Sequence, residues 1–270
     1  MNQLVKHLLW TTAIAPVLLS QSVSAHVIWF EQINPTRGEI FFGHPEEGTP
    51  EPFDLNKFTG ANAYDISGNV IPSTTTFTNG RLFINTVVPA AAYSGSYDNG
   101  FWRENPDGSY DNITAEEAAE IGFENTGQYL KYATGIFNED FPISRSFGQP
   151  LEIRPQSSPF DLTAGDTLPV RVFFNNSLLT NPLVEYQGNE IPVNNGVALI
   201  PIGLEGLEVI EASYSDPNAN NPTLSYAATF STLGYGTIVP QPEPIPEPLT
   251  ILGTLFTLGV LPVLKKNYNK

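Results

Sequence analysis

The sequence predicts an all-β protein made of two β-sandwich (immunoglobulin-like) domains, and three observations support this class. The 270 residues include 24 prolines and 22 glycines, which interrupt the chain too often for long helices. They also include 17 phenylalanines and 11 tyrosines, residue types that favour strands. Short stretches of alternating apolar and polar residues recur between turn signals, as in β-sandwiches.

The start of the chain, residues 1–25, is typical of a secretory signal peptide. Lys6 supplies a positive charge, residues 8–19 are largely apolar, and small residues precede the expected cut by signal peptidase between Ala25 and His26. The alternative is an uncleaved membrane anchor, which the short apolar core disfavours. We therefore expect an exported protein whose first mature residue is His26.

Residues 26–155 are expected to form the N-terminal sandwich domain, which opens with a hairpin of strands 26–31 and 39–44. If residue numbers across the ladder sum to about 70, His26 lies opposite His44 and both side chains point the same way. A shift of one residue would send the two imidazoles to opposite faces. The hairpin register therefore decides whether the histidines meet.

The rest of this domain reads as further strands and one short helix. Thr114 and Glu117 form a capping-box pattern that predicts a helix running to Ile121. An Asn-Pro-Asp-Gly turn at 105–108 predicts a hairpin. The other strands expected in this domain are 61–66, 68–72, 81–88, 101–104, 109–112 and 128–136.

Residues 156–238 are expected to form a separate immunoglobulin-like domain, because short strands follow one another at the spacing of a sandwich. Asn-Asn-Gly at 194–196 and Gln-Gly-Asn at 187–189 supply turns between them. The expected strands are 168–174, 183–186, 197–201, 207–214 and 224–230.

The end of the chain divides into a Pro/Glu linker at 239–248 and an apolar helix with a basic tail at 249–270. Together with the motif Pro246, Glu247, Pro248, this order resembles the PEP-CTERM sorting signal of bacterial exported proteins. The resemblance implies processing by an exosortase-type membrane enzyme. An ordinary single-pass transmembrane anchor is the alternative.

Charge and cysteine content narrow the possible partners. The net charge of the whole chain is -16. The two terminal segments hold four of the 12 basic residues and no acidic residue, so the part between them has 8 basic and 28 acidic residues and a net charge of -20. Such a surface repels nucleic acid and attracts cations. Because the chain has no cysteine, any metal ligands must be histidine, carboxylate or backbone groups.

His26 is the sharpest candidate for a metal ligand. An N-terminal amine has a pKa near 8, so a neutral fraction is available to bind metal beside the imidazole of the same residue. His44, the only other histidine after cleavage, would complete three nitrogens suited to Cu(II) or Ni(II). Glu46, Glu47 and Glu51 can add carboxylates, although such a run is more typical of a solvated loop.

Other sites have weaker signals. Asp98-Asn99-Gly100 and residues 105–111 offer oxygen ligands for calcium, but turn chemistry explains them better. A sugar-stacking platform would use four aromatic residues that more often fill a core. These are Trp29, Trp102, Tyr97 and Tyr110. No nucleophile elbow, phosphate loop or HExxH motif occurs, so we do not expect an enzyme.

Several short segments together form a recognisable pattern. They are His26-Val27-Ile28-Trp29, Gly43-His44-Pro45-Glu46-Glu47, Lys131-Tyr132-Ala133, Gly148 to Ile153, Gly165 to Leu168, Val170-Arg171-Val172, Asn195 to Ala198 and Ser225 to Phe230. With these segments the chain resembles the DUF4198 family, which includes periplasmic proteins related to NikM-type nickel-uptake components. The resemblance implies export, two β-sandwich domains and handling of nickel or cobalt. Family members often carry a further histidine just before Lys131-Tyr132-Ala133, where this chain has Gln128 and its neighbours.

Taken together, the sequence favours an exported cell-envelope protein, periplasmic or extracellular, that binds nickel, cobalt or copper through His26 and His44. Its role would be metal uptake or storage, with a metal transporter as a candidate partner. The alternative is a metal-free structural or adhesion protein of the cell surface or extracellular matrix. A third hypothesis is a copper monooxygenase in which His26 forms half of a histidine brace.

Overall fold

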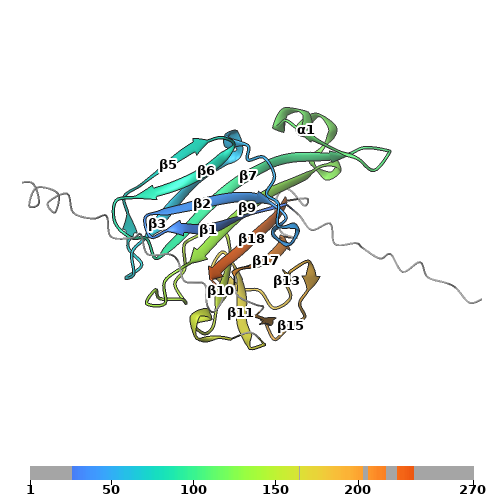
Figure 1. Cartoon of the computed structure of the whole chain (residues 1–270). Coiled ribbons are helices and arrows are strands. Elements are labelled where there is room, and N and C mark those ends of the chain that lie inside the picture. The colour runs from blue at the N-terminus through green and yellow to red at the C-terminus, as the bar shows by residue number, and fades with distance from the viewer. Residues whose placement is uncertain (1–25, 164, 203–205, 217–223, 234–270) are drawn as a thin grey trace, which may run out of the picture. The chain divides into compact units, whose positions relative to one another are not determined.

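The computed structural model describes residues 26–163, 165–202, 206–216 and 224–233, which lie in one compact unit. These residues form three β-sheets and one short α-helix, so the predicted all-β class is confirmed (Figure 1). The expected signal peptide, Pro/Glu linker and C-terminal apolar helix lie outside the described residues. Within the described ranges, every helix is too short or too polar to span a membrane.

A four-stranded sheet begins with the predicted hairpin. Its strands, in spatial order, are β1 (Val27–Asn34), β2 (Arg37–Gly43), β6 (Arg81–Thr86) and β5 (Ser73–Thr78). Ile28 pairs with Phe42 and Phe30 with Ile40, so the partner numbers sum to 70 and the predicted register is confirmed. We did not expect β5, because its Ser-Thr-Thr-Thr-Phe-Thr sequence lacks alternating apolar residues and it is mostly exposed.

A nine-stranded sheet joins strands from both ends of the described chain. Its main path is β14 (Asn189–Glu190), β13 (Leu183–Tyr186), β17 (Leu207–Ser215), β18 (Leu224–Leu233), β9 (Gly127–Ile136), β7 (Ala92–Glu104), β3 (Phe58–Tyr64) and β4 (Val70–Ile71), with β8 (Tyr110–Ile113) paired to β7. The β18–β9 pair is parallel and the others are antiparallel. This parallel pair connects segments almost a hundred residues apart.

The third sheet has five strands. They are β10 (Leu151–Pro155), β11 (Thr167–Phe174), β16 (Val197–Pro201) and β15 (Val193–Asn194), with β12 (Ser177–Leu178) paired to β11. The predicted strands at 168–174 and 197–201 are confirmed as β11 and β16. β10 was not among the expected strands, and Leu151 and Ile153 are buried in it.

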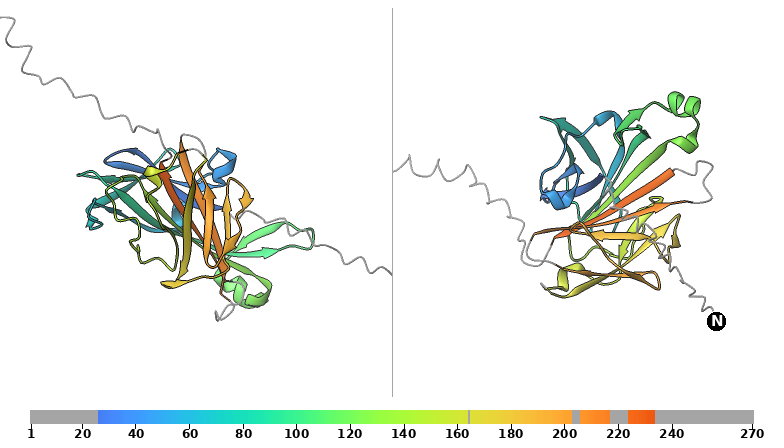
Figure 2. Two further views of the ribbon diagram at one scale, coloured as in Figure 1. Left: turned by 90° about the horizontal axis from the view of Figure 1, so that it is seen from below. Right: turned by 90° about the vertical axis from the view of Figure 1, so that its right-hand side faces the viewer.

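Each of the smaller sheets packs on a different face of the nine-stranded sheet (Figures 1 and 2). One core joins β1, β2 and β6 to Tyr93 and Ala133 of the large sheet. The other joins β10, β11 and β16 to Ala92, Ile136 and Phe230. Because side chains alternate along a strand, neighbouring residues of β7 and β9 serve opposite cores. The described residues are therefore layered as two sandwiches that share a sheet.

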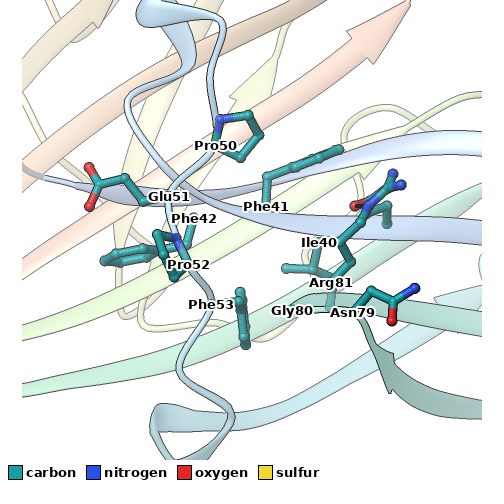
Figure 3. A pocket seen from close by; sticks show the side chains of 11 residues that line it. Ile40, Phe41, Phe42, Pro50, Glu51, Pro52, Phe53, Asn79, Gly80 and Arg81 are labelled. Atoms are coloured by element: carbon teal, nitrogen blue, oxygen red, sulfur yellow. Dashed lines mark hydrogen bonds and ion pairs between the residues drawn. The ribbon is translucent and has the colours of Figure 1, made fainter.

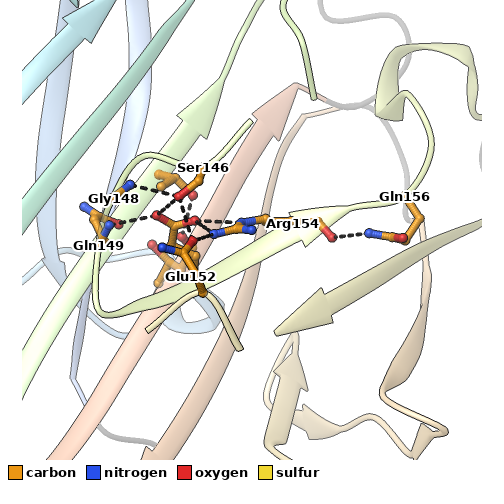
Figure 4. Close-up of polar contacts among 9 residues, drawn as sticks. Ser146, Gly148, Gln149, Glu152, Arg154 and Gln156 are labelled. Atoms are coloured by element: carbon orange, nitrogen blue, oxygen red, sulfur yellow. Dashed lines mark hydrogen bonds and ion pairs between the residues drawn. The ribbon is translucent and has the colours of Figure 1, made fainter. Parts of the chain in front are cut away.

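Strands β13, β17 and β18, which follow the expected domain boundary at 155/156, lie in the same sheet as strands that precede it. The division at 155/156 stays a prediction. The segment 146–154, which leads across this boundary, is held by the buried carboxylate of Glu152. This carboxylate accepts hydrogen bonds from Ser146 Oγ (3.1 Å), the Gln149 backbone nitrogen (2.8 Å) and Arg154 Nε (2.7 Å) (Figure 4). Gln149 also donates to the backbone of β7 and β9.

The helices are short. The predicted capping box is confirmed in α1 (Ala115–Ile121), where Thr114 and Glu117 each accept a backbone hydrogen bond from the other. The 3-10 helices are η1 (Pro45–Glu47), η2 (Leu55–Lys57), η3 (Phe123–Asn125) and η4 (Pro159–Asp161). Of these, η1 directly follows His44 and shapes the candidate site.

Candidate metal centre at the end of the first hairpin

His26 and His44 meet at the open end of the β1–β2 hairpin. His26 immediately precedes β1 and His44 immediately follows β2, so both continue the ladder in which Val27 pairs with Gly43. Their ring centroids lie 4.4 Å apart, at an angle of 55°. The His26 ring also stacks on Phe42, with centroids 5.4 Å apart. The structure therefore brings together the two histidines that the register predicted to meet.

The loop after β2 folds back and adds Glu51 to the pair. Its first turn is η1, and Gly48 directly after η1 has a left-handed conformation with a φ of 68°. The Glu51 backbone N–H then donates to the Phe42 carbonyl at 2.8 Å. Gly43, with a φ of 130°, lets the two segments approach, since a β-carbon there would lie 3.2 Å from the Glu51 nitrogen.

The result is a cluster of two imidazoles and one carboxylate. His26, His44 and Glu51 each offer one ligand atom, and these atoms all lie within 4.8 Å of one another. The shortest contact joins His26 Nε2 to Glu51 Oε1 at 2.7 Å. The side chains of His26 and Glu51 are 43% and 40% exposed, so the cluster is open to solvent. We name His26, His44 and Glu51 the histidine cluster.

The Glu51 contact fixes the tautomer of His26. A carboxylate only accepts hydrogen bonds, so His26 Nε2 must carry the donating proton. Burial lowers the pKa of the His26 imidazole, and the charges of His44 and Lys131 lower it further, against the opposing effect of Glu51. A neutral ring protonated at Nε2 keeps its lone pair on Nδ1, the nitrogen nearer the backbone. That is the atom needed for a chelate with the α-amine of the same residue.

Two further charged groups interact with the histidine cluster, the exposed Glu46 and the buried Lys131. Glu46 Oε1 lies 3.6 Å from His44 Nδ1, which is close enough for an ion pair but too far for a hydrogen bond. Lys131, on β9, is 98% buried, and burial lowers the pKa of its amine to about 8. Sequence reasoning missed Lys131. Its only signal was a single cation inside the strand expected at 128–136.

Glu51 also borders a surface pocket of about 530 Å³ on the outer side of β2. Phe41, Pro50 and Phe53 line it, and Arg81 closes its far end through an ion pair with the buried Glu39 (Figure 3). Figure 3 shows Glu51 and Arg81 at opposite ends of this pocket. Of the histidine cluster, only Glu51 lines this pocket.

Other residues considered from the sequence lie elsewhere. Glu47 is exposed on η1 and is not part of the cluster. Gln128 lies on β9 three residues before Lys131, so strand alternation directs it to the opposite face of the sheet. An amide at position 128 therefore does not replace the missing histidine in this cluster.

In the described part of the chain, the acidic residues considered for calcium form ordinary turns, and two of the four aromatic residues considered for sugar are buried. Asp98 accepts from the Gly100 nitrogen at 2.9 Å, and Asp107 accepts from the Ser109 nitrogen at 2.9 Å, which is turn chemistry. Trp29 and Tyr97 are 5% and 2% exposed, so both fill the core instead of presenting a face to sugar.

A family model matches this chain. The model of a family described as a domain of unknown function, DUF4198, matches residues 23–216, well over half of the chain. This range contains the whole histidine cluster. A comparison with curated proteins returned no match.

Proposed function

This chain belongs to the DUF4198 family, and we propose that it is an exported cell-envelope protein that binds one transition-metal ion through His26 and His44. The observation that carries the proposal is the approach of His26, His44 and Glu51 ligand atoms to within 4.8 Å of one another. Two imidazoles, one of them oriented by a carboxylate, with no thiolate, suit nickel, cobalt or copper. The role is binding for uptake or storage, and no catalytic step is proposed.

Removal of the leader after Ala25 would complete the site. The freed α-amine and Nδ1 of His26 would chelate the ion, and one ring nitrogen of His44 would supply a third nitrogen. Glu51 would then orient the His26 ring by accepting a hydrogen bond from Nε2, the ring nitrogen that does not bind the ion, at 2.7 Å. Carboxylates in this position orient metal-bound imidazoles and raise their basicity. In the uncut chain the amine is part of a peptide bond, so the site would lack its strongest chelate.

The family resemblance favours nickel or cobalt as the metal and NikM-like delivery to a membrane transporter as the role. The acidic surface would concentrate cations near the site, with 28 acidic residues against 12 basic ones in the whole chain. Pro246, Glu247 and Pro248, with the apolar segment that follows, are proposed as a PEP-CTERM signal for an exosortase-type enzyme. The final anchoring of the protein would follow from that processing.

Calorimetric titration of the mature chain with Ni²⁺ tests the site. We expect one ion per chain, loss of that binding in His44→Ala, and about 10–100-fold weaker binding in Glu51→Gln. Glu47→Gln is the matched control, because it removes the same charge from the same loop outside the cluster. Equal affinity in His44→Ala and the wild type would refute the metal-binding proposal.

A further inference from the structure

Three exposed aliphatic side chains lie on two turns at one end of the described unit. Val87 and Val88 directly follow β6 and are 91% and 48% exposed. Ile33, near the end of β1, is 40% exposed. We name Ile33, Val87 and Val88 the apolar tip.

Backbone hydrogen bonds hold the two turns of the apolar tip against each other. Before the two valines, the Thr86 nitrogen donates to the Thr36 carbonyl at 2.9 Å. After them, the Ala90 nitrogen donates to the Pro35 carbonyl at 2.7 Å. Because both ends of the loop at 87–89 are bonded to the β1–β2 turn, its valines and Ile33 belong to one surface.

A third turn at the same end adds two more exposed aliphatic side chains. The Ala91 nitrogen donates to the Tyr64 carbonyl at 2.7 Å, which joins the end of β3 to the segment after the valines. Ile66 lies in the turn that follows Tyr64, and Val70 begins β4; both are exposed. Single exposed apolar residues are normal on a protein surface, whereas a group of them at one end indicates an interaction surface.

The last described strand ends beside the apolar tip. One row of ladder partners crosses four strands of the large sheet, namely Tyr64 of β3, Ala92 of β7, Ile136 of β9 and Thr232 of β18. The turn that holds the two valines leads into this row, because β7 begins at Ala92. β18 ends one residue past the row, at Leu233. The described part of the chain therefore ends at the same end of the sheet as the apolar tip.

β1 and β18 run in the same direction, which places the histidine cluster at the other end. Two hydrogen bonds join them in this order, from Thr229 Oγ1 to the Ile28 carbonyl (2.7 Å) and from the Phe30 nitrogen to Ser231 Oγ (3.3 Å). The histidine cluster lies at the start of β1 and the apolar tip at its end. A strand of this length spans roughly 25 Å.

We propose that the apolar tip docks on the surface of a lipid bilayer while the C-terminal segment anchors the chain. The inference rests on the proposed anchoring and adds an orientation to it. Beyond Leu233 the sequence continues through 234–248 to an apolar, uncharged stretch at 249–264. The intervening segment reaches at most about 50 Å when fully extended. A tether of this length keeps the tip near the bilayer at an effective concentration on the order of millimolar, so a small apolar surface is enough for docking.

The docking is apolar and not electrostatic. Aliphatic side chains at the tips of turns leave water when they enter the boundary between headgroups and acyl chains. The same end of the sheet carries the exposed acidic residues Glu139 and Asp140, which follow β9 and would repel anionic lipid. A zwitterionic bilayer is therefore the surface that fits. Docking would point the histidine cluster away from the bilayer, toward the medium from which the ion is captured.

Quenching of a fluorescent label by lipid tests this orientation. Because the chain has no cysteine, one introduced cysteine takes a bimane label at a chosen position. The complete mature chain is reconstituted in phosphatidylcholine vesicles that contain spin-labelled lipid as the quencher. We expect the label in Val87→Cys to be quenched about twofold or more and the label in Glu47→Cys, an exposed position on η1 beside the histidine cluster, to be unaffected.

Charge substitutions test whether the apolar side chains cause the docking. The label is placed in Ile33→Cys, and Val87→Asp/Val88→Asp should abolish most of its quenching, because a bilayer surface rejects buried carboxylates. Leu199→Asp is the matched control. It puts the same charge on an exposed apolar residue of β16, outside the apolar tip, and should leave the quenching unchanged.

Equal quenching in Val87→Cys and Glu47→Cys, or quenching in Ile33→Cys that survives Val87→Asp/Val88→Asp, would overturn the inference. Vesicle flotation separates this failure from failure of the anchor. Flotation without quenching at position 87 would refute the docking alone, whereas a chain that does not float would refute both the anchor and the docking. Ni²⁺ titration of the same labelled chains reports on the histidine cluster independently of either result.

Discussion

Gly43→Ala should damage the histidine cluster without touching any of its ligands. Gly43 has a φ of 130°, which L-residues rarely adopt, and an added β-carbon would lie 3.2 Å from the Glu51 nitrogen and 3.3 Å from its Cγ. Backbone strain of this kind costs about 1–3 kcal/mol. Because Glu51 and its loop must move to relieve the contact, the His26–Glu51 interaction should be lost as well. We therefore expect about 2–3 kcal/mol of lost stability.

Gly48→Ala is the matched control. Gly48 lies in the same loop with a φ of 68°, but an added β-carbon meets nothing within 4 Å. It should cost only the left-handed strain of about 1 kcal/mol and leave the cluster in place. Urea unfolding of both variants measures the difference, and Ni²⁺ titration should show about tenfold weaker binding for Gly43→Ala alone. Equal stabilities and equal affinities for the two variants would refute the reasoning.

Three further predictions concern the layers that support the site. Phe30→Ala should lower the free energy of unfolding by about 3–5 kcal/mol, because the Phe30 ring is fully buried against Tyr93; chemical denaturation measures this. Glu152→Ala should cost about 3–5 kcal/mol by stranding Arg154, whereas Glu152→Gln should cost less; a loss below 1 kcal/mol for the alanine would contradict the network. Burial raises the pKa of Glu211 from its usual 4.5 to about 8 in the folded protein, so the stability of the fold should be highest below pH 4.5 and fall as the pH rises to 8. This fall should be on the order of 2–4 kcal/mol, and Glu211→Gln should remove most of it in unfolding curves recorded at several pH values without divalent cations. An unchanged pH dependence in Glu211→Gln would contradict the prediction.

Local sequence signals predicted most of the strands and the meeting of the two histidines. The apolar alternation on both sides of the turn at 34–38 fixes one register, and that register brings His26 to His44. The capping box at Thr114 likewise predicted α1, since its two hydrogen bonds are made within four residues. Both features depend on interactions between near neighbours in the chain, and such interactions leave a readable pattern.

Long-range features left no such pattern. Glu51 reaches His26 because the loop returns along β2, a path that depends on the conformation of Gly43 and on a backbone hydrogen bond. The parallel pairing of β9 with β18 follows from how the sheets pack, and no local motif marks it. Lys131 and Glu211 look like ordinary surface charges until that pairing buries them.

The most direct measurement compares Ni²⁺ or Cu²⁺ affinity of two otherwise identical chains, one beginning at His26 and one beginning at Ala25. The extra residue moves the free amine away from the His26 imidazole but leaves all the cluster's side chains in place. Our account predicts one tightly bound ion in the first chain and binding weaker by about tenfold or more in the second. Equal affinity of the two chains would contradict the account.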